Sequence, residues 1–376
     1  PNAIEVLRGM GILQDVLAKV TDSGEPNRAA WMQTRLGREG SELVYNYPYG
    51  PGEFGVGMHR AALLEVFANA LNDKFTTCHM NKRCVQVAQD GTNQGKTWIQ
   101  FGDGTEASAD IVIGADGIKS TVRGAVTLAD PWTDVTFSRS ICYRALVPAD
   151  AVRKAGLRVD LTQRPHVLTF AIRGAQMINV VAFATDRSGD FRAPSANSHR
   201  PDPASPTVIP ATPQELLSEY DGWGSDVINL LSCVEKTDKW LINVLYPELK
   251  SYTRGRVALL GDAAHAMLPH LGAGAGQGIE DAFLLSKLLS NPQTTLENIE
   301  NVLHVYDSIR RPRTQQVWEG SRRAGDIYEL VGSGDDVDIE ELRNQLHGIA
   351  DFVWHHKMED DVAAACEQLK TIGAFV

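Results

Sequence analysis

Two segments of the chain place an aspartate directly after an apolar run and a glycine. One runs from Ile111 to Arg123 (IVIGADGIKSTVR), and the other from Val257 to Asp281 (VALLGDAAHAMLPHLGAGAGQGIED). Each apolar run predicts a buried strand, and glycine lets the backbone turn sharply where a strand ends. Because ligands of open α/β sheets bind at the carboxyl ends of strands, we expect Asp116 and the aspartate of the second segment, Asp262, to stand at a binding rim.

The second segment continues into a glycine-rich turn before the next predicted helix, with glycines at 272, 274, 276 and 278. Glycine lets main-chain N–H groups approach a ligand closely, and a helix N-terminus favours negative charge. The alternative for either segment alone is a tight connection with a solvated aspartate.

Composition narrows the class of partner. The chain has 376 residues, 43% of them hydrophobic, and a net charge of −11 without a Lys/Arg block, which argues against a nucleic-acid or anionic-membrane surface and favours a small molecule. No apolar run approaches the ~18 residues of a membrane span, and the N-terminus lacks a signal-like core, so we expect a soluble, cytoplasmic protein.

The cysteines give no sign of disulfides or of a metal site. The five cysteines are scattered and include no CxxC pair, which fits reduced thiols.

The turn after each apolar run is named a bend: the first bend carries Asp116 and the second carries Asp262. Hydrophobic spacing predicts the helices and strands that position these two bends. We expect an amphipathic helix over residues 4–17 and a second helix led by Arg60. Strands are predicted at 84–87, 97–101 and 110–114, and the last should be buried on both faces because it is continuously apolar. From 131 to 250 alternating runs predict a second, mostly antiparallel sheet, and 296–376 should be largely helical.

Several of these motifs together resemble one family, the FAD-dependent aromatic hydroxylases or single-component flavoprotein monooxygenases. GADGIKSTVR (114–123) resembles their DG motif, and GDAAHAMLPHLGAGAGQGIEDA (261–282) resembles their GD motif and flavin loop. HRAALLEVF (59–67) resembles the helix whose arginine touches the cofactor. YRALVP (143–148) and YDSIRRPRTQQV (306–317) are most similar to salicylate hydroxylases and their fungal relatives, and the resemblance covers nearly the whole chain.

The resemblance implies an α/β fold. Residues 1–130 and 251–325 should form a discontinuous, Rossmann-like FAD-binding domain, with an inserted, mostly antiparallel substrate-binding domain at 131–250. Residues 326–376 should form C-terminal helices, and 40–58 should contribute to the substrate sheet.

The resemblance also assigns cofactor-binding residues. Arg60 is expected near the ribityl and pyrophosphate of FAD. Asp116 and Gly117 are expected to organise the motif that serves FAD and nicotinamide binding, and Gly261 and Asp262 to meet the ribityl chain. The loop along the isoalloxazine edge should stabilise reduced flavin through its N–H groups, and its expected members are Pro269, Gly272, Ala273, Gly274 and Ala275.

Two residues are candidates for catalysis. Arg144 resembles a catalytic arginine of fungal members and could hold a substrate phenolate or carboxylate. His270 lies beside the flavin loop in sequence, and an imidazole suits the orientation or deprotonation of a substrate hydroxyl; the alternative is a surface histidine. Leu271 replaces a glutamine common in relatives, which should remove a polar group beside the ring.

One part of the family pattern is absent from the sequence. The family begins with a strand, a GxGxxG turn on the FAD pyrophosphate, a helix and a second strand ending in an acidic residue. No such pattern occurs here. We therefore expect that one βαβ unit of ~30 or more residues is missing, as in a fragment or an incomplete gene model.

The expected function is hydroxylation of a phenolic or aromatic acid, salicylate-like, with NAD(P)H and O₂ as co-substrates, in a possible homodimer. Two alternatives stay open. One is a truncated, non-catalytic paralogue that no longer binds FAD. The other is a dearomatising or epoxidising flavin monooxygenase of secondary metabolism; the lack of tyrosine between positions 143 and 220 favours simple ring hydroxylation instead.

Overall fold

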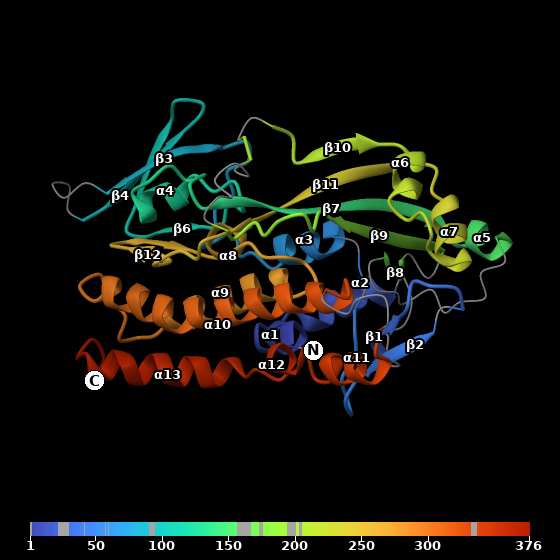
Figure 1. Cartoon of the computed structure of the whole chain (residues 1–376). Coiled ribbons are helices and arrows are strands. Elements are labelled where there is room, and N and C mark those ends of the chain that lie inside the picture. Colours follow the sequence, from blue (N-terminus) through green and yellow to red (C-terminus); the bar gives the residue numbers. More distant parts are fainter. Residues whose placement is uncertain are drawn as a thin grey trace.

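The fold is layered, with most of the strands above the long helices (Figure 1). In this view most strands lie over α9 (Gly274–Leu289) and α10 (Ile299–Tyr328), and α13 (Met358–Thr371) packs beneath both. The computed structural model describes residues 2–21, 30–40, 42–56, 58, 60–89, 95–155, 167–172, 176–193, 201–202, 205–331 and 337–376.

A short parallel pair carries both predicted bends. β6 (Val112–Gly114) and β13 (Val257–Leu259) run in parallel, and β12 (Thr253–Arg254) pairs antiparallel with the other side of β13. β13 is buried throughout, but Ile113 in β6 is 41% exposed. The prediction that β6 is buried on both faces is therefore wrong, because among the described strands β6 is an edge and its Ile113 side faces solvent.

Helices α9, α10 and α13 enclose the main core around β13. Leu284 and Leu288 of α9, Leu303 of α10 and Leu369 of α13 share this cluster with Leu259. The Tyr306 hydroxyl of α10 donates to the Leu259 carbonyl at 2.9 Å, so the long helix is hydrogen-bonded to the strand that leads into the second bend. The predicted C-terminal helices are confirmed, and they include α11 (Ile339–Leu346) and α12 (Asp351–Trp354).

The second sheet is antiparallel, as predicted. Its order is β10 (Val208–Ala211), β11 (Thr237–Leu245), β7 (Val135–Pro148), β9 (Met177–Thr185) and β8 (Val167–Ile172). One face carries a core against three short helices, which are α5 (Ala149–Lys154), α6 (Pro213–Ser218) and α7 (Ser225–Ser232). Tyr143, Ala145 and Val147 alternate along β7 with exposed residues, the period of two that a half-covered strand requires.

Two smaller sheets complete the strands. The predicted strand at 110–114 is shortened to Val112–Gly114 in the structure, and a strand that was not predicted, Glu106–Ala109, precedes it. This strand, β5, completes an antiparallel sheet with β3 (Cys84–Gln89) and β4 (Thr97–Phe101). Residues of the segment 40–58 form β2 (Leu43–Pro48), which pairs with β1 (Ala30–Arg35) in a separate sheet rather than with the five-stranded one. The division into domains stays a prediction.

The N-terminal segment forms two helices where one was predicted. α1 (Asn2–Gly9) ends before Gly11, whose φ of +77° leaves the helical region, and α2 (Leu13–Thr21) then begins. α3 (Arg60–Asn69) packs on α2, and α1 packs on α9. Among the described helices, none combines the length and the apolarity that crossing a bilayer requires.

Candidate active site

The two aspartate bends lie side by side. The Leu260 N–H donates to the Gly114 carbonyl at 3.0 Å, which extends the parallel register of β6 and β13 into both turns. The carboxylates of Asp116 and Asp262, each two residues beyond one of these groups, are exposed. The fully buried Arg123 of α4 (Val122–Thr127) donates to the Ala263 carbonyl at 3.2 Å, so it ties the helix after the first bend to the second bend.

Asp116 holds the first bend in shape. Its carboxylate accepts from the Ser120 hydroxyl at 2.5 Å and from the backbone N–H groups of Thr121 and Val122 at 2.7 and 3.2 Å, just before α4. Gly117 has a φ of +76°, and no atom lies within 4 Å of the position that a Cβ would take there. The bend therefore presents a rigid backbone surface without a side chain in front of it.

The second bend depends on a conformation reserved for glycine. Gly261 has φ 61° and ψ −145°, a region that residues with a Cβ essentially do not enter. Its N–H donates to the Asp281 carboxylate at 2.8 Å. Asp262 follows at the start of α8 (Asp262–His265), so the conformation of Gly261 determines where this exposed carboxylate stands.

A buried ionic cluster supports the second bend from below. Besides Gly261, Asp281 contacts His265 Nε2 at 2.6 Å and Arg310 Nε at 2.7 Å, and Arg310 also bonds Glu280 at 2.7 Å. Burial alone would raise the pKa of Asp281, but His265 and Arg310 outweigh it and lower that pKa to about 2. The sequence motifs did not predict this cluster. The sequence did carry one sign of it, because charged residues lie within helices that must be buried, and buried charges need partners.

The loop between α8 and α9 is hydrogen-bonded to α10 through the Ser321 hydroxyl. Ser321 Oγ donates to the Leu268 carbonyl at 2.6 Å and accepts from the Leu271 N–H at 3.2 Å. The Leu271 side chain is buried in a cluster with residues of α10 and α11, and its predicted place beside the ring stays a prediction. Gly272, with a φ of +60°, has no atom within 4 Å of its Cβ position.

The two bends and this loop fit the flavin and ribityl parts of FAD. Open backbone at Gly117 and Gly272 lets a ligand approach closely, and the exposed Asp262 carboxylate can accept from ribityl hydroxyls. The first N–H groups of α9, at Gly274 and Ala275, lack partners within the helix and can face an anionic ring. Pro269 is exposed and Ala273 is buried at the same loop, and their cofactor roles stay predictions.

Arg60 is exposed at the first residue of α3, whose Val66 packs on α2. Its predicted contact with the cofactor therefore stays a prediction. His265, in contrast, is buried in the ionic cluster. Within the described ranges, no group of three or more His, Cys, Asp and Glu residues has a metal-binding arrangement.

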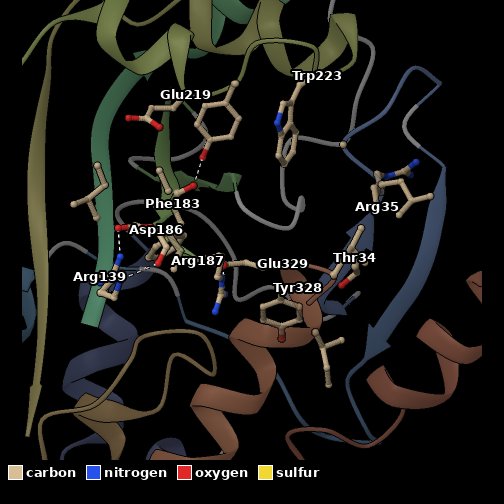
Figure 2. A pocket seen from close by; sticks show the side chains of 18 of the residues that line it. Thr34, Arg35, Arg139, Phe183, Asp186, Arg187, Glu219, Trp223, Tyr328 and Glu329 are labelled. Carbon is tan, nitrogen blue, oxygen red and sulfur yellow. Dashed lines mark hydrogen bonds and ion pairs between the residues drawn. The ribbon is translucent and has the colours of Figure 1, made fainter. Parts of the chain in front are cut away.

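A cavity of about 580 Å³ lies beside the last residues of β9, Phe183–Thr185. β8 pairs with β9 from Met177 to Ala182, so no strand of the described residues pairs with Phe183–Thr185 on the side away from β7. Figure 2 shows Thr34 and Arg35 of β1 on one side of the cavity and Arg139 of β7 on the other, with Tyr328 near the end of α10.

Four of the charged residues in the cavity wall form ion pairs with one another. Arg139 forms an ion pair with Asp186, and Arg187 forms ion pairs with Glu329 and, at 3.1 Å, with Asp326. The wall is therefore held by ion pairs between β7, β9 and α10, and its remaining surface is largely aromatic and aliphatic.

Neither predicted catalytic residue lines this cavity, but His270 contacts two residues that do. The half-buried His270 ring is 5.2 Å from the Phe183 ring and 6.5 Å from the Tyr328 ring, centroid to centroid, and both partners line the cavity. Arg144 pairs with Val181, and Cys142 pairs with Phe183, so Arg144 shares the sheet face of Phe183. Its exposed guanidinium lies 5.2 Å from the ring centroid of Trp240. Both catalytic roles stay predictions.

Comparison with known proteins identifies the class. A family model described as "FAD binding domain" matches residues 230–321, which contain the second bend, the loop and α9. A salicylate hydroxylase of Pseudomonas putida is 35% identical, covering 98% of this chain and 85% of its own. A 6-methylsalicylate 1-monooxygenase of Aspergillus terreus is 32% identical, covering 88% and 72%. The solved structure of a salicylate hydroxylase substrate complex superposes with a TM-score of 0.83 at 31% identity, covering 97% and 88%.

The fold and the paired bends thus define a flavin-dependent oxidoreductase of the monooxygenase class. Within that class, the chain belongs to the FAD-dependent aromatic hydroxylases, as the sequence motifs indicated.

Proposed function

We propose that this enzyme hydroxylates the ring of a phenolic or aromatic acid of the salicylate class, with NAD(P)H as reductant and O₂ as oxygen source. The observation that carries the proposal is the contact of His270 with two residues of the cavity wall, Phe183 and Tyr328. His270 directly follows Pro269 in the loop next to the second bend, so the loop that fits the flavin also borders the cavity that fits an aromatic ring. FAD, when bound, supplies the oxygen-activating redox chemistry.

The residues of this chain would bind and orient the substrate. His270 would orient or deprotonate the phenolic hydroxyl, and Arg144, on the Phe183 face of the sheet, would hold the carboxylate or phenolate. The aromatic cavity wall would exclude water from the reacting ring. The relatives named for salicylate and 6-methylsalicylate support this substrate class.

Turnover with salicylate tests the proposal. NAD(P)H consumption and hydroxylated product are measured for the FAD-loaded protein and for His270→Ala and Arg144→Ala, with exposed His355→Ala and Arg153→Ala as matched controls. We expect both site variants to lose at least tenfold in kcat/KM while the controls stay within twofold. FAD-loaded protein that forms no hydroxylated product from salicylate would overturn the proposal, and failure to bind FAD at all would favour the non-catalytic alternative.

A further inference from the structure

The cavity is larger than a one-ring phenol requires. A cavity of about 150 Å³ is enough to bind benzene, and clefts of about 300–1,000 Å³ usually hold ligands of drug size. At about 580 Å³, this cavity would leave most of its space unfilled around salicylate. Unfilled apolar space contributes nothing to affinity, so its presence indicates a larger ligand.

The extra space leads away from His270. Phe183 lies on the sheet face that His270 contacts, whereas its neighbour Ala184 pairs with Ile141 on the face covered by α6 and α7. Phe183, Ala184 and Ile141 all line the cavity, so it reaches both faces of the sheet at the end of β9. In Figure 2, Trp223 lies on the opposite side of the cavity from Tyr328.

An aromatic pair closes this far side. The rings of Tyr220 and Trp223 meet edge to face with centroids 5.0 Å apart, and the Tyr220 hydroxyl donates to the Phe183 carbonyl at 2.6 Å. This bond fixes the Tyr220 ring against the end of β9. The far wall is therefore a rigid aromatic surface.

The charges of the wall favour a neutral occupant. Three cationic and three anionic residues line the cavity, so they add no net charge: Arg35, Arg139, Arg187, Asp186, Glu219 and Glu329. Two of the arginines are already paired with acids of the same wall. A charged extension such as a nucleotide or an acyl phosphate would gain no net attraction here, whereas a ring or aliphatic chain would bury apolar surface.

We propose that the physiological substrate is an aromatic acid that carries a second, neutral group of about one ring in size, lodged against Trp223 while the reacting ring lies near Phe183 and Tyr328. This inference rests on the proposed function, which it extends from a class of reacting ring to the size and charge of its substituent.

Calorimetric binding to the FAD-loaded protein tests the inference without relying on turnover. The probes are salicylate, 4-phenylsalicylate and 5-phenylsalicylate. We expect at least one phenylsalicylate to bind tenfold or more tightly than salicylate. Trp223→Ala should remove most of that advantage and change salicylate affinity less than twofold, because a single ring does not reach Trp223. Trp98→Ala, which truncates a half-buried tryptophan on β4, is the matched control and should change neither affinity.

A second variant guards against loss of folding in the first. Ala184→Phe should fill the far part of the cavity and also abolish the advantage of the phenylsalicylates, while the exposed Ala107→Phe should not. The inference is overturned if both phenylsalicylates bind no more tightly than salicylate to the unmodified protein, or if Trp223→Ala and Ala184→Phe weaken all three ligands equally. Normal salicylate turnover with either result would leave the proposed function standing, whereas tight phenylsalicylate binding without hydroxylation would refute only the proposed function.

Discussion

The Leu260 amide donates to the Gly114 carbonyl across 3.0 Å, so two bends separated by more than 140 residues in sequence share one sheet edge. Below this edge, Asp281 holds Gly261 and is itself held by Arg310. The proposed flavin site is therefore built on a buried ionic cluster.

Arg310→Met should destabilise the protein by about 3–5 kcal/mol, because it leaves the buried carboxylates of Asp281 and Glu280 without their shared cation. Equilibrium unfolding in urea measures the change. The control is Arg8→Met, which removes a solvent-exposed ion pair with Glu5 and should cost less than about 1 kcal/mol. Equal losses in both variants would show that the Arg310 cluster does not stabilise the fold.

The stability of the protein should fall in acid through Asp281. Its pKa is lowered from 3.8 to about 2 in the folded state, so its contribution is fully present above pH 4 and is lost as the pH falls towards 2. The difference corresponds to about 2 kcal/mol. Unfolding free energies measured between pH 5 and 2.5 should decline less steeply in Asp281→Asn than in the unmodified protein. An identical pH dependence of the unfolding free energy in both proteins would contradict the conclusion that Asp281 causes the loss of stability in acid.

Ser321→Ala should loosen the loop between α8 and α9, because it removes a bond to the Leu268 carbonyl and one to the Leu271 N–H, both buried. Each unsatisfied buried group costs about 1–3 kcal/mol. Hydrogen exchange of the Leu271 amide should become at least tenfold faster. Ser308→Ala, which removes a hydroxyl bonded to Val305 and Gln368 elsewhere on α10, should leave that amide unchanged.

Gly325→Ala should impair turnover by displacing His270. A Cβ at position 325 would lie 2.4 Å from His270 Cδ2, so the imidazole must move. We expect kcat to fall as far as in His270→Ala while FAD affinity stays within threefold, since the three atoms nearest to the added carbon all belong to the His270 ring. Gly102→Ala, where the nearest atom would be 3.5 Å from the added carbon, is the control. Unchanged kcat in Gly325→Ala would remove His270 from the mechanism.

The strands that could be predicted from the sequence are those whose residues are all buried or are buried in strict alternation. The continuous apolar run at Val257–Leu259 and the alternation along β7 both follow directly from burial, which is why they could be predicted. The break at Gly11 was not predicted, because the apolar spacing continues across that residue while the positive φ depends on how α1 and α2 pack.

The same limit applies to the site. The motifs identified both bends, since glycine and aspartate after an apolar run are visible in sequence. The contact of Asp281 with Arg310 joins residues on two helices, and the stacking of Arg144 on Trp240 joins two strands. Tertiary packing determines which residues form such pairs, so no local sequence pattern predicts them.

A crystal structure of the protein soaked with FAD is the most direct test of the claim that the two bends form one cofactor site. We expect density for the ribityl chain within about 2.6–3.2 Å of the Asp262 carboxylate and for the flavin ring along residues 269–275. Density for FAD at a surface that touches neither Asp262 nor Gly117 would contradict the claim of one shared cofactor site.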